Sequence, residues 1–416
     1  MSQAQNIIDN RAYDVERIRL DFPILNQEIH GKPLIFLDNG ASSQKPRQVI
    51  DAMRGVYEAE YANVHRGAYY LSEKATERYE GARDIVQRFL NARSRREIIF
   101  SKNVTEAINM VAYSYARRVL EPGDEIIITD MEHHSNIVPW QLMRDERGLV
   151  LKFVSCTDDG EFRIEDLAKL ITPKTKLISL THVSNVLGTV VPIKEVAKLA
   201  HDKGAKLMVD GAQAVMHMPV DVQDLDCDFY AFTGHKVYGP SGIGVLYGKE
   251  ELLEAMPPFL AGGDMISTVS MEKSTWAALP AKFEAGTPPI AQAIGLGVAL
   301  EYVGNIGLER IAAHEIELLD YATQKLLSID GLRIVGTAPG KTPVVSFTMD
   351  CAHPHDISTI IDRVGVSVRA GHHCAQPLME RMGVSATTRA SFGMYNTRDE
   401  ADSLVTALES VREIFG

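Results

Sequence analysis

Short apolar runs typical of buried strands alternate along this chain with segments that have the period of a helix, from about residue 95 onward. The helical segment at residues 192–200, for example, ends at Gly204, and a strand-like run follows it. Strands that alternate with helices form a mostly parallel sheet with helices on both faces. We therefore expect an α/β protein with strands at residues 97–100, 125–128, 151–154, 177–180 and 207–209.

Two strand-like runs are each followed by a charged residue. Asp210 follows residues 206–209, and Lys236 follows residues 229–232 after a short Thr-Gly-His run. Neighbouring parallel strands would bring both side chains to one edge of the sheet, where open α/β sheets bind ligands. A partly buried lysine can form a Schiff base, and a buried aspartate needs a cationic partner such as a pyridinium nitrogen. The pair therefore predicts a pyridoxal phosphate (PLP) site.

Polar residues that follow other strands fit the remaining parts of PLP. Thr105 lies where an apolar helix begins, so its hydroxyl and the helix dipole favour a phosphate there. Thr233 and His235 flank the lysine and add donors to the same phosphate. His133 follows the strand at 125–128 and is placed to stack on the face of the ring. Two further side chains can hydrogen-bond the ring hydroxyl, Asn185 and Gln213.

A second structural unit is expected after about residue 303, because 416 residues exceed what one ordinary core holds. Residues 308–327 have the pattern of a long amphipathic helix, and residues 398–415 that of a closing helix. Shorter strands are expected between them, at residues 332–335, 344–347 and 366–369. The predicted division is an N-terminal arm at 1–31 that packs with the smaller domain, a large domain at 32–303 and a small α+β domain at 304–416.

The composition argues against several classes of partner. A net charge of −12 gives no electrostatic attraction to nucleic acid or to an anionic membrane. The longest weakly polar stretch, residues 290–300, is too short to span a bilayer, and the first six residues lack the pattern of a secretory signal. The cysteines have no CxxC spacing, which indicates reduced thiols and a cytoplasmic protein: Cys156, Cys227, Cys351 and Cys374.

Two groups of residues contain potential metal ligands, but neither is expected to bind a metal ion. His372, His373 and Cys374 are adjacent in an extended segment, so their side chains point in opposite directions, and nothing nearby completes a tetrahedral set. The pair His314-Glu315 has Leu318 where a second zinc histidine would stand, and we expect it on the surface of a helix. No metal site is therefore expected.

Several runs together resemble those of one enzyme family. Four are similar to those of class V, fold-type I PLP enzymes: Glu132–Asn136, Ser184–Gly188, Asp210–Gln213 and Thr233–Lys236. A fifth, Arg369–Pro377, narrows the resemblance to the group II cysteine desulfurases of the SufS type. The similarity extends from Leu37 to Gly393. It implies a large domain with a mostly parallel seven-stranded sheet and a smaller C-terminal α+β domain that carries Cys374.

The resemblance also implies a role for individual residues. Lys236 corresponds to the lysine that binds PLP as a Schiff base and moves the Cα proton, Asp210 to the partner of the pyridinium nitrogen, and His133 to the residue stacked on the ring. Cys374 corresponds to the sulfur acceptor, and Arg389 to the clamp on the substrate carboxylate. The other implied contacts are Gln213 and Asn185 on the ring hydroxyl and the substrate, Thr105, Thr233 and His235 on the phosphate, Arg369 and His65 beside Arg389, and Thr287 on the phosphate of the other subunit of a homodimer.

The implied activity converts L-cysteine to L-alanine and keeps the sulfur as a persulfide on Cys374. A SufE- or SufU-like acceptor would then carry the sulfur to iron–sulfur cluster assembly. Three alternatives stay open: a selenocysteine lyase, an aminotransferase or racemase in which Cys374 is incidental, and a scaffold protein without a cofactor. The intact Lys236, Asp210 and Arg389 argue against the last. The chain departs from the family at Asn103–Thr105, where many relatives have Gly-Thr-Thr, so one hydroxyl donor to the phosphate is missing.

Overall fold

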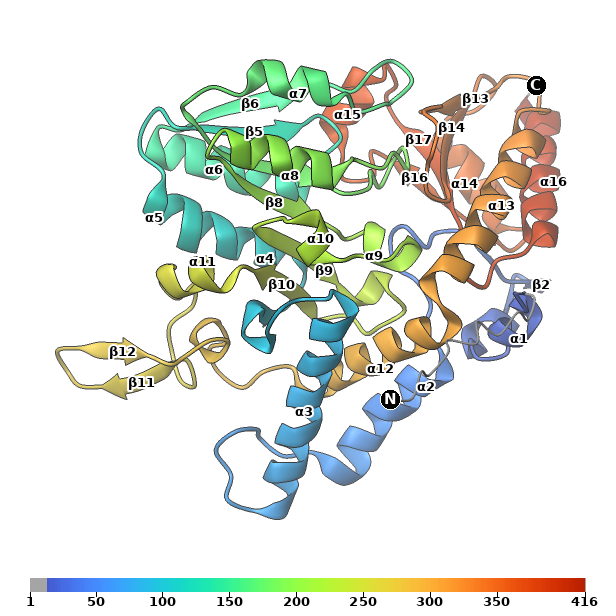
Figure 1. Cartoon of the computed structure of the whole chain (residues 1–416). Helices are drawn as coiled ribbons and strands as arrows, with labels where there is room; N and C mark the ends of the chain where they lie inside the picture. The colour runs from blue at the N-terminus through green and yellow to red at the C-terminus, as the bar shows by residue number, and fades with distance from the viewer. Residues whose placement is uncertain (1–12, 416) are drawn as a thin grey trace, which may run out of the picture.

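The structure is a computed structural model that describes residues 13–415. The first twelve residues of the predicted arm, and with them the segment considered for a secretory signal, lie outside this range. A seven-stranded sheet forms the centre of the larger part, and β10 runs antiparallel to both of its neighbours (Figure 1). The predicted mostly parallel seven-stranded sheet is thus confirmed. Its strands, in spatial order, are β4 (Ile98–Ser101), β10 (Gly244–Gly248), β9 (Phe229–Thr233), β8 (Lys206–Asp210), β7 (Thr175–Thr181), β5 (Glu125–Thr129) and β6 (Val150–Val154).

Helices cover both faces of this sheet because successive strand residues point to opposite sides. In β8, Leu207 and Val209 pack into one apolar core, whereas Met208 packs into the other. The first core includes residues of α3 (Tyr70–Phe89), α8 (Ile193–Asp202) and α12 (Ile290–Ile306). The second includes residues of α4 (Val104–Met110), α6 (Val138–Arg147) and α11 (Glu250–Ala255). Every central strand is therefore buried on both sides, which explains its continuous apolar sequence.

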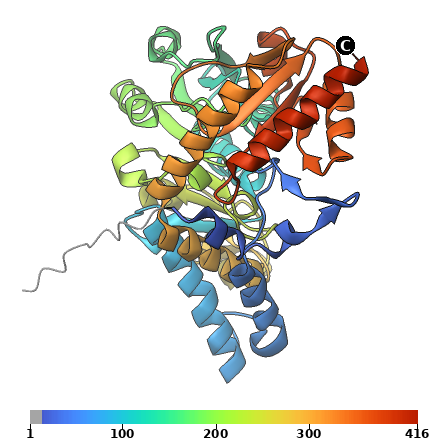
Figure 2. The same cartoon turned by 90° about the vertical axis from the view of Figure 1, so that its right-hand side faces the viewer.

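A second, antiparallel sheet lies beside the first. Its order is β13 (Leu332–Val335), β14 (Val344–Met349), β17 (Thr387–Ser391) and β16 (Arg369–Gly371). Figure 2 shows α13 (Leu308–Leu326) and α16 (Arg398–Phe415) side by side along it. Residues of these two helices and of α14 (Pro354–Asp362) share an apolar core with β14 and β17. This part matches the expected α+β pattern.

Two details of the C-terminal part of the chain differ from the sequence prediction. The single strand predicted at residues 366–369 is two strands that separate at Val368. The first, β15 (Val366–Ser367), pairs in parallel with β3 (Ile35–Phe36), whereas β16 pairs with β17. The prediction is wrong here because the two ends of the segment take different partners. The pair His314-Glu315 also differs, because Glu315 is buried and its carboxylate lies 2.7 Å from Nδ1 of His217.

The division into domains stays a prediction. The boundary expected near residue 303 falls within the last turn of α12, and the chain turns at Gly307, whose φ is +94°, before α13 begins. Of the predicted arm, Tyr13 donates its hydroxyl to the carbonyl of Met394 at 2.6 Å, and Arg19 pairs with Glu400 at 3.0 Å. The described part of the arm therefore contacts the C-terminal part of the chain.

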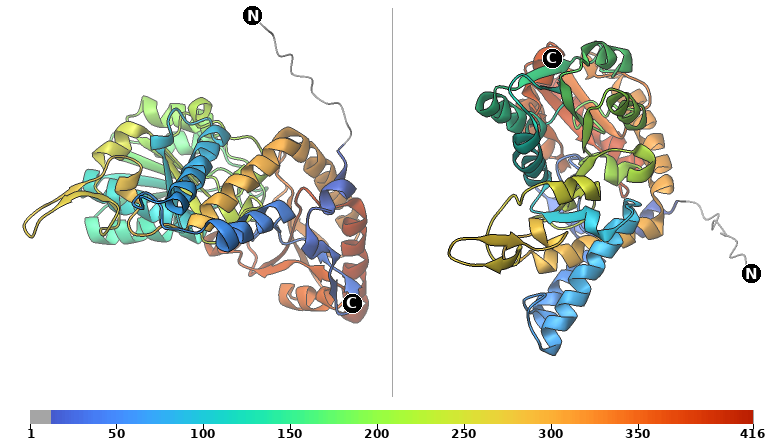
Figure 3. Two further views of the ribbon diagram at one scale, coloured as in Figure 1. Left: turned by 90° about the horizontal axis from the view of Figure 1, so that it is seen from below. Right: turned by 60° about the vertical axis from the view of Figure 1, so that its left-hand side comes forward.

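Shorter elements complete the fold. The hairpin of β11 (Ile266–Val269) and β12 (Ser274–Trp276) projects from the body of the molecule (Figure 3). No helix within residues 13–415 combines the length and the apolar character needed to cross a membrane. The remaining helices and strands are α1 (Val15–Arg19), α2 (Arg47–Gly55), α5 (Arg117–Val119), α7 (Ile164–Leu170), α9 (Ala214–His217), α10 (Val222–Leu225), α15 (Gln376–Arg381), β1 (Glu28–Ile29) and β2 (Lys32–Pro33).

Candidate active site

A cavity of about 300 Å³ lies where the carboxyl ends of β7, β8 and β9 face the small sheet. Most of the residues singled out in the sequence line it, from both parts of the fold. They are Thr105, His133, Asn185, Asp210, Gln213, Thr233, His235, Lys236, Arg369, Cys374 and Arg389. The structure thus brings these residues together, and it leaves His65 and Thr287 outside.

Asp210 and Lys236 meet at the ends of neighbouring strands. Asp210 is the last residue of β8 and lies opposite Ala231 of β9, and Lys236 ends the single helical turn that follows β9. Burial raises the pKa of Asp210, although the backbone N–H of Ala212 donates to its carboxylate at 3.0 Å. Burial also lowers the pKa of Lys236 to about 8, against the opposing effect of Asp210. A lysine with this pKa is partly neutral near neutral pH, as Schiff-base and proton-transfer chemistry requires.

His133 is held as a neutral ring. It precedes a turn of 3₁₀ helix (His134–Asn136), and the backbone N–H of Ser135 donates to its Nδ1 at 3.1 Å. Burial, and then the nearby Lys236, lower the pKa of His133 to about 3. A neutral imidazole suits stacking on an aromatic ring, because it brings no charge that would have to be desolvated.

Glu132, directly before this histidine, connects the end of β5 to the 3₁₀ turn that follows His133. Its carboxylate accepts from the Thr129 hydroxyl and from the Asn136 side chain, both at 2.6 Å. Burial raises the pKa of Glu132 to about 8. Sequence reasoning gave this residue no separate role, and its position three residues after the end of a buried strand was the available signal.

Several buried polar atoms of the cavity wall have no partner among the described residues. They include Oε1 of Gln213 and Oγ1 of Thr233, whose side chains are 2% and 3% exposed. The amide nitrogen of Gln213 is used, since it donates to the carbonyl of Gly40 at 2.7 Å. Buried polar atoms without partners are rare in proteins and indicate a missing ligand. A ligand with ring-hydroxyl and phosphate oxygens would satisfy them, so these residues fit PLP.

The expected phosphate site lies at the start of α4. Thr105 is in the first turn of this helix and lines the cavity. The side chain of Asn103 caps the helix, because its oxygen accepts from the backbone N–H of Glu106 at 2.9 Å. Asn103 therefore serves the helix itself, and the hydroxyls expected to face a phosphate belong to Thr105 and Thr233.

Two arginines of the cavity share one aspartate. Arg369 and Arg389 are directly opposite each other on β16 and β17. Asp38 accepts from Arg389 Nη2 at 3.1 Å and from Arg369 Nη2 at 2.8 Å. Arg389 also donates from Nη1 to the carbonyl of Asn185 at 2.8 Å, while its buried Nε has no partner. Burial lowers the pKa of Arg389, with Asp38 acting in the opposite direction.

Asp38 is thus a site residue that sequence reasoning did not identify. It follows the short strand β3, and Leu37 lies between them. A carboxylate directly after an apolar run was the only local signal. Its function depends on two arginines that lie more than 300 residues later in the chain.

Cys374 lies in the turn between β16 and α15. It is exposed and lines the cavity, so its thiol is open both to the cavity and to solvent. Asn185 contacts this turn, because its side-chain nitrogen donates to the carbonyl of His373 at 2.7 Å. Among residues 13–415, no three His, Cys, Asp or Glu side chains are arranged to hold a metal ion.

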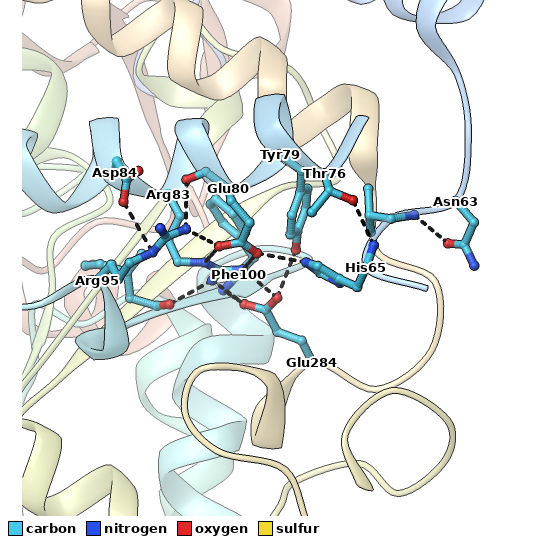
Figure 4. A network of polar contacts seen from close by, with 12 residues as sticks. Asn63, His65, Thr76, Tyr79, Glu80, Arg83, Asp84, Arg95, Phe100 and Glu284 are labelled. Atoms are coloured by element: carbon cyan, nitrogen blue, oxygen red, sulfur yellow. Dashed lines mark hydrogen bonds and ion pairs between the residues drawn. The ribbon is translucent and has the colours of Figure 1, made fainter. Parts of the chain in front are cut away.

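His65 and Thr287 lie elsewhere. His65 contacts Glu80 through Nε2 at 2.9 Å, in a network that also contains Arg83 and Glu284 (Figure 4). Thr287, three residues after Glu284, is exposed and lines a separate cavity of about 490 Å³ together with aromatic side chains of η2 (Val56–Glu60) and its surroundings. In this chain, neither residue belongs to the cavity that contains Lys236.

Most of the chain matches one family of proteins. The family model described as aminotransferase class-V matches residues 35–404, and the chain belongs to this family, whose members depend on PLP. Its curated relatives include a probable cysteine desulfurase of Streptomyces coelicolor, 52% identical over 97% of this chain and 98% of the relative. A probable cysteine desulfurase of Halalkalibacterium halodurans is 50% identical over 97% of this chain and 99% of the relative.

Solved structures agree with these relatives. The cysteine desulfurase CsdA of Escherichia coli has a TM-score of 0.91 at 39% identity, over 98% of this chain and all of that one. A cysteine desulfurase of Thermococcus onnurineus has a TM-score of 0.91 at 40% identity, over 96% of this chain and 98% of that one. The resemblance to class V PLP enzymes is therefore confirmed, while the group II subtype stays a prediction.

Proposed function

We propose that this protein is a PLP-dependent cysteine desulfurase that converts L-cysteine to L-alanine and keeps the sulfur as a persulfide on Cys374. One observation carries the proposal: the Cys374 thiol lines the same cavity as Lys236, Asp210 and Arg389. An aminotransferase or racemase needs the last three residues but has no use for a thiol at this position.

The residues of the cavity divide the work of holding the cofactor. Lys236 would bind the PLP aldehyde, Asp210 its ring nitrogen, His133 its face, and Gln213 its hydroxyl. Asn185 lines the same cavity and would contact the ring hydroxyl and the substrate, and Thr105, Thr233 and His235 would hold the phosphate. Bound PLP supplies an electron-withdrawing group that makes the Cα proton of the amino acid removable.

The substrate is bound through its carboxylate. Nε of Arg389 is buried without a partner and gives this group a charge-assisted hydrogen bond, with Arg369 next to it. Lys236, whose pKa is lowered to about 8 by burial, takes the Cα proton as a base. The carboxylate and the amino group together place the substrate sulfur toward Cys374.

Sulfur transfer then needs a thiolate at Cys374. The thiolate forms an S–S bond with the substrate sulfur, and the C–S bond of the substrate breaks. The electron pair of that bond stays with the carbon skeleton, which takes up a proton and leaves as L-alanine. Atoms balance without any oxidant, because one cysteine and one thiol give one alanine and one persulfide.

Partners are part of the same proposal. A homodimer is supported by Thr287, which is exposed and lies outside the cavity of the phosphate residues of its own chain, as expected if it serves the other subunit. A SufE- or SufU-like protein is the proposed sulfur acceptor in iron–sulfur cluster assembly, supported by the exposure of Cys374. We place this reaction in the cytoplasm, consistent with four free cysteines.

The test compares L-alanine release from L-cysteine by the PLP-loaded wild type and by Cys374→Ala. We expect release to collapse in the variant, by at least about 100-fold. Equal release would contradict the persulfide mechanism. The same pair of proteins assayed with L-selenocysteine tests the lyase alternative, which predicts that Cys374→Ala keeps its activity.

A further inference from the structure

The turn that carries Cys374 has an unusual backbone. His373 and Cys374 have φ values of +53° and +57°, so two consecutive residues with side chains adopt the left-handed conformation. This conformation is unfavourable for residues other than glycine and persists only where the surroundings hold it. The contacts of this turn should therefore show what keeps the thiol in place.

His134 contacts the turn at two points, at Cys374 itself and two residues further along the chain. Its backbone N–H donates to the carbonyl of Cys374 at 2.7 Å. Its ring Nε2 accepts from the backbone N–H of Gln376 at 3.1 Å. No other side chain among residues 13–415 accepts from this N–H. The histidine begins the 3₁₀ turn His134–Asn136, which follows β5 after residues 130–133, so it connects the Cys374 turn to the large sheet.

Other contacts also hold the turn: the backbone N–H of Ala375 donates to the carbonyl of His372 at 2.9 Å, which closes the turn around His373 and Cys374. Asn185 donates to the carbonyl of His373, and Nε2 of His373 lies 2.8 Å from the hydroxyl of Thr387. These bonds fix the start of the turn. The carbonyl of Cys374 and the N–H of Gln376 both bond to His134, which is therefore the residue that ties the end of the turn bearing the thiol to the large sheet.

We propose that His134 is a positioning residue for sulfur transfer: its ring nitrogen, as an acceptor, holds the Cys374 turn so that the thiol faces the substrate sulfur. This rests on the proposed desulfurase function. An accepting Nε2 requires a neutral ring with its proton on Nδ1. Burial, and then the neighbouring His372, lower the pKa of His134, which agrees with a neutral ring.

A matched pair of variants at His134 separates the effect of losing the hydrogen-bond acceptor from the effect of changing the shape of the side chain. Glutamine and methionine have the same length, but only glutamine offers an oxygen near the position of Nε2. His134 is partly exposed, so neither substitution opens a buried cavity. In both variants the backbone N–H of residue 134 still reaches the carbonyl of Cys374.

The PLP-loaded variants are assayed for L-alanine release over a range of L-cysteine concentrations. His134→Met should lower kcat about tenfold or more, because a misplaced nucleophile is costly. The KM should stay within about threefold, because Arg389 is unchanged, and His134→Gln should keep kcat within about threefold of the wild type. If the methionine variant does not fold, a tenfold loss in His134→Gln alone overturns the proposal.

Hydrogen exchange of the Gln376 amide supplies a readout that does not depend on turnover. Exchange should be faster in His134→Met than in the wild type and in His134→Gln. Equal exchange and equal kcat in all three proteins would overturn the positioning role, as would a glutamine variant as impaired as the methionine variant. An inactive wild type would instead reject the desulfurase function, and the exchange experiment would still decide whether His134 holds the turn.

Discussion

Two buried arginines of this protein, Arg83 and Arg389, differ in how completely their charge is satisfied. Arg83 is 0% exposed, and all three of its nitrogens donate. Its acceptors are both oxygens of Glu284, both oxygens of Glu80 and the carbonyl of Ile98, as part of the network in Figure 4. Burial works against its charge, but Glu284 outweighs this effect, and the pKa of Arg83 is raised.

Arg389 is 2% exposed, yet it has one carboxylate partner, Asp38, which it shares with Arg369. Its Nε has no acceptor, and burial lowers its pKa. An unmet buried donor costs folding free energy, about 1–3 kcal/mol. A protein keeps such a group where a ligand completes it. The comparison therefore supports the proposal that Arg389 binds a substrate anion, and it favours a role for Arg83 in the stability of the fold.

The largest effect is expected for Arg83→Met. This change leaves Glu284, whose side chain is 9% exposed, without the guanidinium of Arg83, while Glu80 keeps Arg95. The free energy of unfolding should therefore fall by about 3–5 kcal/mol. Urea denaturation of the PLP-loaded protein measures it. Arg95→Ala is the control, because its partly exposed ion pairs with Glu80 and Asp84 should contribute at most about 1 kcal/mol. A loss of unfolding free energy below about 1 kcal/mol in Arg83→Met would contradict the stabilising role given to Arg83.

Arg389→Met should show the opposite pattern. Loss of the charge-assisted contacts to the substrate carboxylate should lower kcat/KM for L-cysteine about 100-fold, since such bonds contribute about 1.5–3 kcal/mol. The free energy of unfolding should change by less than about 1 kcal/mol, because a poorly satisfied charge is removed together with its desolvation cost. Steady-state kinetics and urea denaturation of the same preparation provide both values. A variant that is destabilised but fully active would reverse the assignment.

Asp38→Asn tests whether Asp38 positions the two arginines of the cavity, and its expected kinetic effect is smaller than that of Arg389→Met. Asparagine keeps the shape of the side chain but removes the charge that holds Arg369 and Arg389 at fixed positions. We expect the KM for L-cysteine to rise about fivefold to tenfold, because the arginines lose their orientation toward the carboxylate. The kcat should change less. An unchanged KM would show that the two strands alone position the arginines.

The smallest expected effect is on the pH dependence of stability, and it concerns Glu80 in the network around Arg83. Burial alone would raise the pKa of Glu80, but hydrogen bonds from His65 and Arg83 outweigh it and hold the pKa below its usual value. A depressed folded-state pKa adds stability above the unfolded pKa of about 4.3, and this stability is lost as the pH falls toward the folded value. Glu80→Gln should remove about 1 kcal/mol of this pH dependence, measured by urea denaturation between about pH 5 and pH 3. An identical pH profile in the variant would contradict the role given to Glu80.

The sequence predicted the parts of the molecule in which neighbours along the chain carry the signal. The central strands are continuous apolar runs, and Asp210 and Lys236 directly follow two of them, so their meeting at one edge follows from parallel pairing. Strands β10 and β17 were not predicted, because their sequences lack the continuous apolar pattern of a buried strand. In β10, a Cβ on Gly244 would lie 2.7 Å from the Cα of Asn103, so packing requires a glycine that weakens the strand pattern.

Strand β17 was missed for a functional reason. Its residues include Thr387, Thr388, Arg389 and Ser391, all buried, so a polar run forms an interior strand. The link between Asp38 and the two arginines was also beyond local patterns, because it depends on which strands of the small sheet pair. This polar strand and the ion pairs of Asp38 lie at the site, and there the local sequence departs from the rules that govern the core.

The most direct test of the central claim is to locate the sulfur after one turnover. The PLP-loaded protein is mixed with a limiting amount of L-cysteine, the remaining thiols are alkylated, and peptides with each of the four cysteines are analysed by mass spectrometry. The persulfide mechanism predicts that Cys374 alone gains one sulfur atom, in an amount equal to the L-alanine released. L-Alanine without added sulfur on Cys374, or the same addition on Cys156, Cys227 or Cys351, would contradict it.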